Sequence, residues 1–386
     1  MQIPKSISIS ELESSLSEIK SSQELRLPSS LSLGGGLGIE AALAQAVMTW
    51  ARNNNDPTLH LYANENEALA NIWDLATSSY GLSALLLASQ IHDEQHNKIS
   101  RLEALNEITP IIDAMYTGDL KGTIGGKGAR PKTINLYSIN HAEREYISPF
   151  YSGETVKPEQ EFSALVRKIS ETMLSREIKI NKYRLGRIGT FLHELILNAS
   201  THGSEDISRI KLKRALRGIT VKHNHIKKEQ IPRYSHGNPE LFKFLSKNIL
   251  TNNSDGLDFF EISILDSGPG LAKHWLSHKR KEQITSLGSF SLTEERQATL
   301  ECFDKHTTAK DSDESGMGLH NATTAMNSLK AFARLRTGRL SLQQAFDGTS
   351  KTERFRPKIS PNQENLEEIE GTLFTICIPV QRHESK

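Results

Sequence analysis

The most constraining feature of this sequence is an apolar segment, Phe259–Leu265 (FFEISIL), which runs directly into Asp266, Gly268 and Gly270. Apolar, β-favouring residues bounded by turn-forming residues predict a buried β-strand. A carboxylate at the end of such a strand can accept a hydrogen bond from the exocyclic amine of adenine, and glycines let the backbone approach the base closely. The same string also suits an ordinary turn, because turns favour Asp, Ser, Gly and Pro.

A second motif, Glu194–Gly203 (ELILNASTHG), predicts three polar side chains on one face of a helix. Glu194, Asn198 and His202 follow one another at intervals of four residues, and the neighbouring residues are apolar. An amide oxygen suits Mg²⁺, which prefers oxygen ligands, and the carboxylate can orient a water or hydroxyl as a general base. Taken alone, this spacing is also typical of a solvated helix face.

A third motif lies in the polar segment that contains Lys310, Gly316, Gly318 and Leu319. Here a Gly-x-Gly-Leu string leads into a helical pattern. Backbone amides and a helix N-terminus in this arrangement can hold phosphate groups, and Lys310 can reach a terminal phosphate. A Gly-x-Gly before a helix is also common where no phosphate binds.

The fourth motif is Gly-Thr at the start of the last predicted strand, Gly371–Val380. Thr372 there can hydrogen-bond near an adenine, although the same residues also suit an ordinary strand start. The four motifs occur in one chain in a fixed order. Each lies on the type of element that its chemistry needs, so their combination is more specific than any one of them.

In this order, the motifs resemble those of the ATP-binding superfamily that unites gyrase, Hsp90, histidine kinases and MutL. The resemblance covers roughly residues 160–380. It implies a histidine-kinase-like two-layer α/β sandwich, with helices on one face of a mixed sheet, and it implies bound ATP and Mg²⁺. Asn198-Ala-x-x-His202-Gly203 is most similar to the corresponding motif of the anti-sigma-factor serine kinases, which transfer phosphate to a protein.

Carried over residue by residue, the resemblance implies a role for each position. Glu194 would be the general base, Asn198 would ligate Mg²⁺, and Asp266 would bind the adenine amine. The remaining cofactor contacts that it implies are Gly268, Gly270 and Thr372 around the base, and Gly316, Gly318 and Leu319 at the phosphates, with Lys310 and His202 in support.

Some features depart from the family pattern. About 55 residues separate the first two motifs, which is long for a connection, and the third motif has two glycines rather than three. His141 does not lie in the helical hairpin that carries the phosphoacceptor of sensor histidine kinases. Three functions stay open: γ-phosphate transfer to a protein Ser/Thr or to water, an ATP-gated switch, and a binding module without catalysis. Glu194 counts against the last.

The rest of the chain predicts a second, N-terminal α/β domain, because strand and helix patterns alternate over residues 25–95. Ser78–Leu85 resembles, over this short segment, the switch loop of anti-sigma-antagonist domains. A Pro- and Gly-containing stretch, 148–158, is the predicted boundary. The predicted organisation is a mobile lead (1–24), the N-terminal domain (25–147) and the ATP-binding domain (159–382), the last with insertions near 204–257 and 272–313.

Composition narrows the class of protein further. The 47 basic and 46 acidic residues balance, so net charge does not indicate a nucleic-acid or membrane partner. Cys302 and Cys377 form neither a disulfide framework nor a paired-cysteine metal motif. The N-terminus lacks a signal-peptide pattern, and no apolar run is long enough to span a membrane. We therefore expect a cytoplasmic protein. The resemblance to the anti-sigma-factor serine kinases implies a signalling role with a protein partner, and a homodimer is an open alternative.

Overall fold

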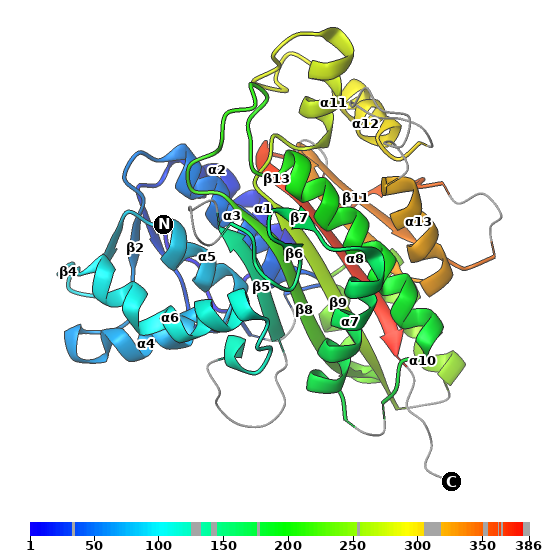
Figure 1. Ribbon diagram of the computed structural model, residues 1–386, viewed down its shortest axis with the longest axis horizontal. Coiled ribbons are helices and arrows are strands. Elements are labelled where there is room, and N and C mark those ends of the chain that lie inside the picture. Colours follow the sequence, from blue (N-terminus) through cyan, green and yellow to red (C-terminus); the bar gives the residue numbers. More distant parts are fainter. Residues whose placement is uncertain are drawn as a thin grey trace.

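The computed structural model confirms a mixed α/β protein with two separate main sheets (Figure 1). It describes residues 1–32, 35–124, 133–139, 145–175, 178–252, 255–304, 318–349, 354–361, 363 and 366–380. None of the helices in these ranges is long and apolar enough to cross a lipid bilayer.

The larger sheet has seven strands in the order β12-β11-β10-β13-β9-β8-β5. The strands are β5 (Thr133–Ile139), β8 (Leu216–Lys227), β9 (Gly256–Asp266), β10 (Phe332–Gly338), β11 (Leu340–Ala345), β12 (Lys358–Ile359) and β13 (Ile369–Val380). All of their pairings are antiparallel, so the predicted mixed sheet is wrong. The reason is connectivity: β8 and β9 pair as consecutive strands, as do β10 and β11, and β13 returns between β9 and β10.

One face of this sheet is covered by α7 (Glu159–Met173), α8 (Lys182–His202) and α13 (Gly318–Leu329). Figure 1 shows α8 lying along the strands, with α13 beside it. The ring of Phe191 on α8 packs edge-on against Phe374 of β13, with centroids 5.9 Å apart. The apolar residues of the second predicted motif therefore bury α8 against the sheet and leave its polar positions near the surface.

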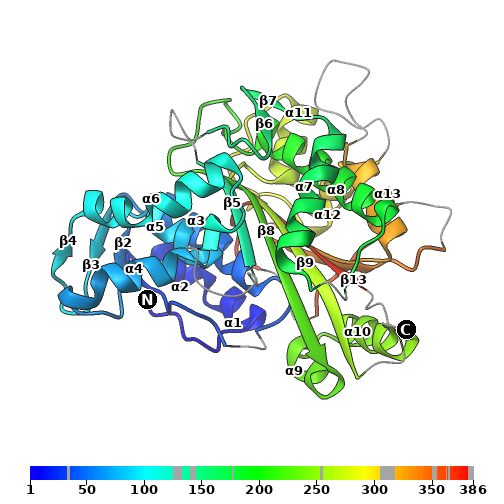
Figure 2. The same cartoon turned by 60° about the horizontal axis from the view of Figure 1, so that its bottom comes forward.

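The opposite face is also covered, so the prediction of helices on one face is wrong. Its helices are α3 (Ile39–Asn53), α9 (Ile231–Ser235) and α10 (Pro239–Asn252), and Figure 2 shows α9 and α10 at the far end of β8 and β9. Gln45 on α3 donates a hydrogen bond to the carbonyl of Glu370 at 3.1 Å, and the Tyr234 hydroxyl of α9 donates to Glu261 at 2.7 Å. α3 is buried on nearly all sides, because it packs against the larger sheet and also against helices of the N-terminal part of the chain.

The smaller sheet has the order β1-β2-β3-β4, with the first three strands parallel and the fourth antiparallel. Its strands are β1 (Glu24–Arg26), β2 (Thr58–His60), β3 (Gln90–His92) and β4 (Lys98–Ile99). The helices α4 (Ala68–Ala76), α5 (Ser79–Leu87) and α6 (Arg101–Thr117) follow in this unit. The predicted alternation of strands and helices is confirmed here. However, β5, which lies within the predicted N-terminal domain, pairs with the larger sheet.

The predicted mobile lead is instead folded. It forms α1 (Ile9–Ser14) and α2 (Leu16–Ser21), and Leu16 and Ile19 are buried. Ser8 and Glu11 form a reciprocal capping box at the start of α1. Glu13 binds two buried arginines of β10, Arg334 and Arg336. The polar composition of this segment therefore reflects caps and ion pairs.

The predicted insertions also differ from the structure. Residues 216–227 form β8, a strand between β9 and β5, rather than part of an insertion. Polar residues in it have partners: Lys222 pairs with Glu40 of α3 at 2.6 Å, and His225 lies 3.2 Å from Asp258 of β9. In the second predicted insertion, α11 (Leu271–Arg280) and α12 (Leu292–Glu301) lie beyond the ends of the strands (Figure 1). At the predicted boundary, β6 (Tyr151–Ser152) and β7 (Thr155–Val156) form a small hairpin.

Candidate functional site

Asp266 ends β9, and Thr372 lies directly opposite it in β13. The backbone and hydroxyl of Thr372 both hydrogen-bond to the Asp266 carboxyl, and the amide of Gly268 donates to its Oδ1 at 2.9 Å. Burial raises the pKa of this carboxyl to about 6, and these hydrogen bonds partly oppose the rise. The strand pairing thus fixes the orientation of a half-buried acid at the edge of the site.

Glycines let the turn after Asp266 pack closely against two neighbouring segments. A Cβ added to Gly268 would overlap the carbonyl oxygen of His202, at the end of α8. Gly371 has a φ of 74°, where an added Cβ would overlap the carbonyl oxygen of Asp266, and its amide donates to the Gly268 carbonyl at 2.9 Å. Gly270 also has a positive φ of 83°. These close backbone approaches therefore require glycine at both Gly268 and Gly371.

Glu194, near the middle of α8, faces the start of α13. Its Oε1 accepts a hydrogen bond from Asn321 Nδ2 at 3.0 Å, and a Cβ added to Gly318 would lie 3.0 Å from its Oε2. Asn198 lies one turn further along α8, and both side chains are half-buried. The structure thus brings a carboxylate, an amide and a glycine-led helix N-terminus together.

The last polar position of α8 contacts α11. The ring of His202 lies 4.1 Å from that of His274 between centroids. Both rings line a pocket of about 470 Å³, with Thr201, Glu205, Asp206, Ile207, Arg209, Ser277, His278, Lys281, Glu282 and Gln283. Burial lowers the pKa of His274, and His278 and Arg209 lower it further. The His202 side chain therefore forms part of the lining of this pocket.

The third motif is described only in part. Lys310 and Gly316 lie outside the described residues. Gly318 and Leu319 begin α13, and the Leu319 side chain packs into the main core. The predicted phosphate contacts of Lys310, Gly316 and Leu319 therefore stay predictions from the sequence.

Sequence reasoning missed one residue at the site, Arg52 of α3. Its guanidinium donates to the carbonyl oxygen of Ser267, inside the turn that follows Asp266. It also pairs with Glu370 of β13 at 3.0 Å. Arg52 lies far from the motifs in sequence and belongs to no motif, so no local signal points to it.

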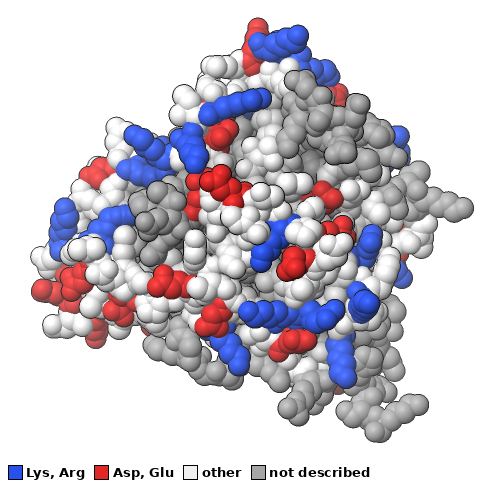
Figure 3. Space-filling model, viewed as in Figure 1, with Lys and Arg blue, Asp and Glu red and all other residues white. Residues whose placement is uncertain are grey.

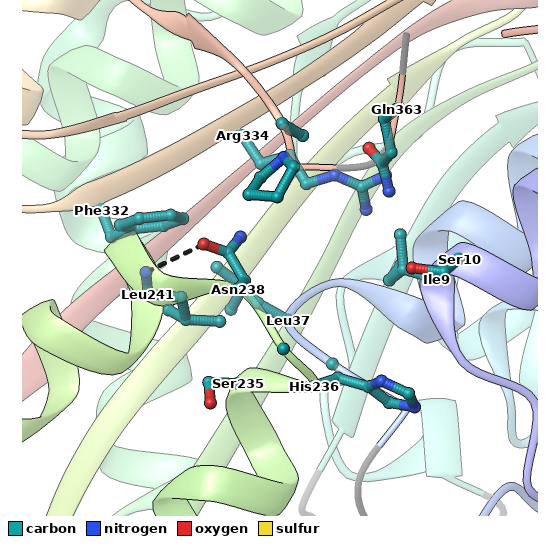
Figure 4. A pocket seen from close by; sticks show the side chains of 14 residues that line it. Ile9, Ser10, Leu37, Ser235, His236, Asn238, Leu241, Phe332, Arg334 and Gln363 are labelled. Atoms are coloured by element: carbon teal, nitrogen blue, oxygen red, sulfur yellow. Dashed lines mark hydrogen bonds between the residues drawn. The ribbon is translucent and has the colours of Figure 1, made fainter.

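A second, small cavity of about 50 Å³ lies on the α3 side of the larger sheet. Figure 4 shows Arg334 and Gln363 on one wall and His236 on the other, with Asn238 accepting a hydrogen bond from the Leu241 amide at 3.1 Å. Since Arg334 is already paired with Glu13, the space suits a water rather than a substrate.

The surface and the comparisons add little about a partner. On the face in Figure 3, basic and acidic side chains are interspersed, as the balanced charge of the sequence predicts. Comparison of the chain with protein-family models, curated proteins and solved structures gives no match. A functional interpretation therefore depends on the residues of the site itself.

Proposed function

We propose that this protein binds ATP and Mg²⁺ between α8, the turn after β9 and the start of α13, as the superfamily that its motifs resemble does. The observation that carries the proposal is the Asp266 arrangement. Gly268 and Thr372 occupy part of the carboxyl's hydrogen-bonding capacity, and a carboxylate has about four acceptor positions. Three of these positions are taken, and the remaining one suits the amine of adenine.

The opposite end of the site suits phosphates and a hard cation. Asn198 provides an amide oxygen, which suits Mg²⁺ because this ion prefers oxygen ligands, and Glu194 lies one helical turn away. Mg²⁺ bound there would neutralise phosphate charge. The N-terminus of α13, which faces Glu194, offers backbone amides and a favourable dipole to an anion.

We propose that Glu194 orients the attacking oxygen, which belongs to a Ser/Thr hydroxyl of a protein partner or to water. The new bond forms between that oxygen and the γ-phosphorus, and the bond from the γ-phosphorus to the β,γ-bridging oxygen breaks. ADP leaves, and Glu194 accepts the proton of the attacking group. Positioning and charge neutralisation supply most of the acceleration in reactions of this class.

A second candidate is an ATP-gated switch, and the contacts of Arg52 favour it. Arg52 links the turn after Asp266 to α3, which belongs to the N-terminal part of the chain. A nucleotide that shifts this turn would therefore change the packing of α3. A kinase labels a partner with phosphate, whereas a switch changes its conformation or oligomeric state with nucleotide and hydrolyses ATP slowly.

Titration calorimetry with ATP and Mg²⁺ tests the binding site. We expect the wild type to bind and Asp266→Ala to lose binding while it stays folded, as checked by circular dichroism. Asp74→Ala is the matched control, because Asp74 is exposed on α4 in the N-terminal unit. The proposal is wrong if the folded wild type does not bind, or if Asp266→Ala binds as tightly as Asp74→Ala.

A further inference from the structure

Three histidines meet in the N-terminal unit, away from the proposed nucleotide site. His60 ends β2, His92 ends β3, and His96 lies in the turn that leads to β4. Each offers one ring nitrogen, and these nitrogens all lie within 4.8 Å of one another. Figures 1 and 2 show β2 and β4 at the end of the molecule opposite to α8 and α13.

The sheet itself brings two of these rings together. β2 and β3 are parallel neighbours, and His60 is in register with His92. Paired residues on adjacent strands point to the same face of a sheet, about 4.8 Å apart. The ring centroids of His60 and His92 accordingly lie 5.3 Å apart, and the rings meet edge-on.

The third ring is held by a constrained turn. Asp93 accepts hydrogen bonds from the amides of Gln95 and Asn97 at 2.9 and 2.8 Å. His96 adopts a positive φ of 67°, which is uncommon for a residue other than glycine. This conformation places its ring 4.4 Å from that of His60 between centroids. The turn thus directs an otherwise exposed side chain onto the other two histidines.

The nitrogens at the centre of this cluster lack satisfactory partners. His60 Nε2 and His92 Nδ1 are buried, and neither makes a hydrogen bond to any described residue. Glu24 Oε2 of β1 lies 3.3 Å from His60 Nε2, at ion-pair distance. Buried polar atoms are nearly always paired, so buried imidazole nitrogens without a hydrogen bond, within a cluster of three histidines, indicate an occupant.

One of the neighbouring cations, Arg26, has other partners. Arg26, which is in register with His60, donates to the Leu61 carbonyl at 3.1 Å and lies 4.3 Å from the centre of the Tyr62 ring. Its charge is therefore engaged elsewhere. The available donors are three imidazoles and one carboxylate.

We propose that His60, His92 and His96 bind one Zn²⁺ ion, with the Glu24 carboxylate as the fourth ligand. Zn²⁺ favours four nitrogen, sulfur or oxygen ligands in a tetrahedron, at about 2.0–2.2 Å for imidazole and carboxylate. Ligand atoms at these distances lie about 3.3 Å apart in a tetrahedron, so the rings close in on the ion from their present spacing. Because the protein supplies all four ligands, the site is structural rather than catalytic.

The role of this ion follows from where its ligands lie. They come from β1, β2, β3 and the turn before β4, so one ion ties together all the strands of the smaller sheet. β1, β2 and β3 each have only three residues. The ladder hydrogen bonds of such short strands hold them weakly, and metal binding contributes directly to folding stability.

The test is a titration of the metal-free full-length protein with ZnCl₂ in the presence of excess Mg²⁺ and without nucleotide. Excess Mg²⁺ occupies any oxygen-rich site but competes poorly for imidazole. We expect one equivalent of Zn²⁺ to bind and to raise Tm. Co²⁺ in its place should give the visible absorption bands of a tetrahedral complex.

Variants distinguish this site from adventitious binding. We expect His92→Gln and His96→Gln to weaken Zn²⁺ binding at least 100-fold, because each removes an imidazole ligand, and Glu24→Gln to weaken it about 10-fold, because the amide keeps an oxygen but loses the negative charge. His236→Asn is the matched control, because His236 is an exposed histidine with a positive φ outside the cluster. It should bind as the wild type does.

His96→Gln keeps the test valid if the other variants fail to fold, since His96 is exposed. The proposal is overturned if the metal-free wild type binds no Zn²⁺, or if His96→Gln binds it with unchanged affinity and stoichiometry. Neither result bears on ATP binding, which is measured separately.

Discussion

Replacing Asp266 by asparagine should stabilise the fold at neutral pH. Burial raises the pKa of this carboxyl from 3.8 to about 6, although Gly268 and Thr372 donate hydrogen bonds to it. Between these two pKa values the folded protein keeps a proton that the unfolded chain has lost. The stability that the protonated Asp266 carboxyl contributes is therefore complete below pH 3.8, and it is lost as pH rises through 6. Asparagine has a similar shape and does not ionise.

The pKa difference sets the size of the effect. One pKa unit corresponds to 1.36 kcal/mol, so ionising Asp266 in the folded state costs about 3 kcal/mol at pH 7.5 and about half as much at pH 5. The free energy of unfolding of Asp266→Asn, relative to the wild type, should thus rise by about 1 kcal/mol between pH 5 and pH 7.5. This change with pH does not depend on any constant difference in packing between the two side chains.

Urea unfolding at pH 5 and pH 7.5, followed by circular dichroism, measures this change. Asp74→Asn, on the exposed side of α4, is the control and should show no dependence on pH beyond that of the wild type. The reasoning is refuted if the free energy of unfolding of Asp266→Asn, relative to the wild type, stays constant or falls from pH 5 to pH 7.5. An acid that destabilises the fold at neutral pH is typical of a functional site rather than of a structural one.

Three further predictions concern the site and the core. Glu194→Ala should retain ATP binding by calorimetry and lose turnover by roughly 100-fold or more, as loss of a general base does; turnover at the wild-type rate would contradict the assignment. Gly371→Ala should lower the free energy of unfolding by about 3 kcal/mol or more in urea, because the added Cβ overlaps the Asp266 carbonyl at a positive φ; a loss below about 1 kcal/mol would show that the turn can shift. Glu13→Ala should cost about 3–5 kcal/mol, because it leaves Arg336 buried without its carboxylate; a near-neutral result in the same assay would argue against the ion pair.

The local elements that carry the motifs could be predicted from the sequence. The apolar segment 259–265 lies in β9, and the residues before Gly203 form α8. Both follow from short-range rules, namely the β-propensity of apolar residues and the helical repeat that puts Glu194 and Asn198 on one face. The start of α13 at Gly318 agrees with its Gly-x-Gly-Leu pattern for the same reason.

The polar segments could not be predicted in this way, because their partners are distant in sequence. The polar composition that includes His223 and His225 favoured an insertion, but both rings lie 3.2 Å from Asp258 of β9. Residues 1–24 looked mobile, but Glu13 is buried against β10. Composition reports the polarity of a residue and not the presence of a partner, so buried ion pairs resemble solvated surface.

The sequence by itself determined which elements form and which side chains share a helix face, since both depend on residues a few positions apart. Only the tertiary structure decided that Thr372 lies opposite Asp266, that Arg52 contacts the turn between them, and that His60 and His92 share one face of a sheet. These contacts depend on strand register and layer packing. Both are set by the burial of the whole chain, and no local sequence pattern records them.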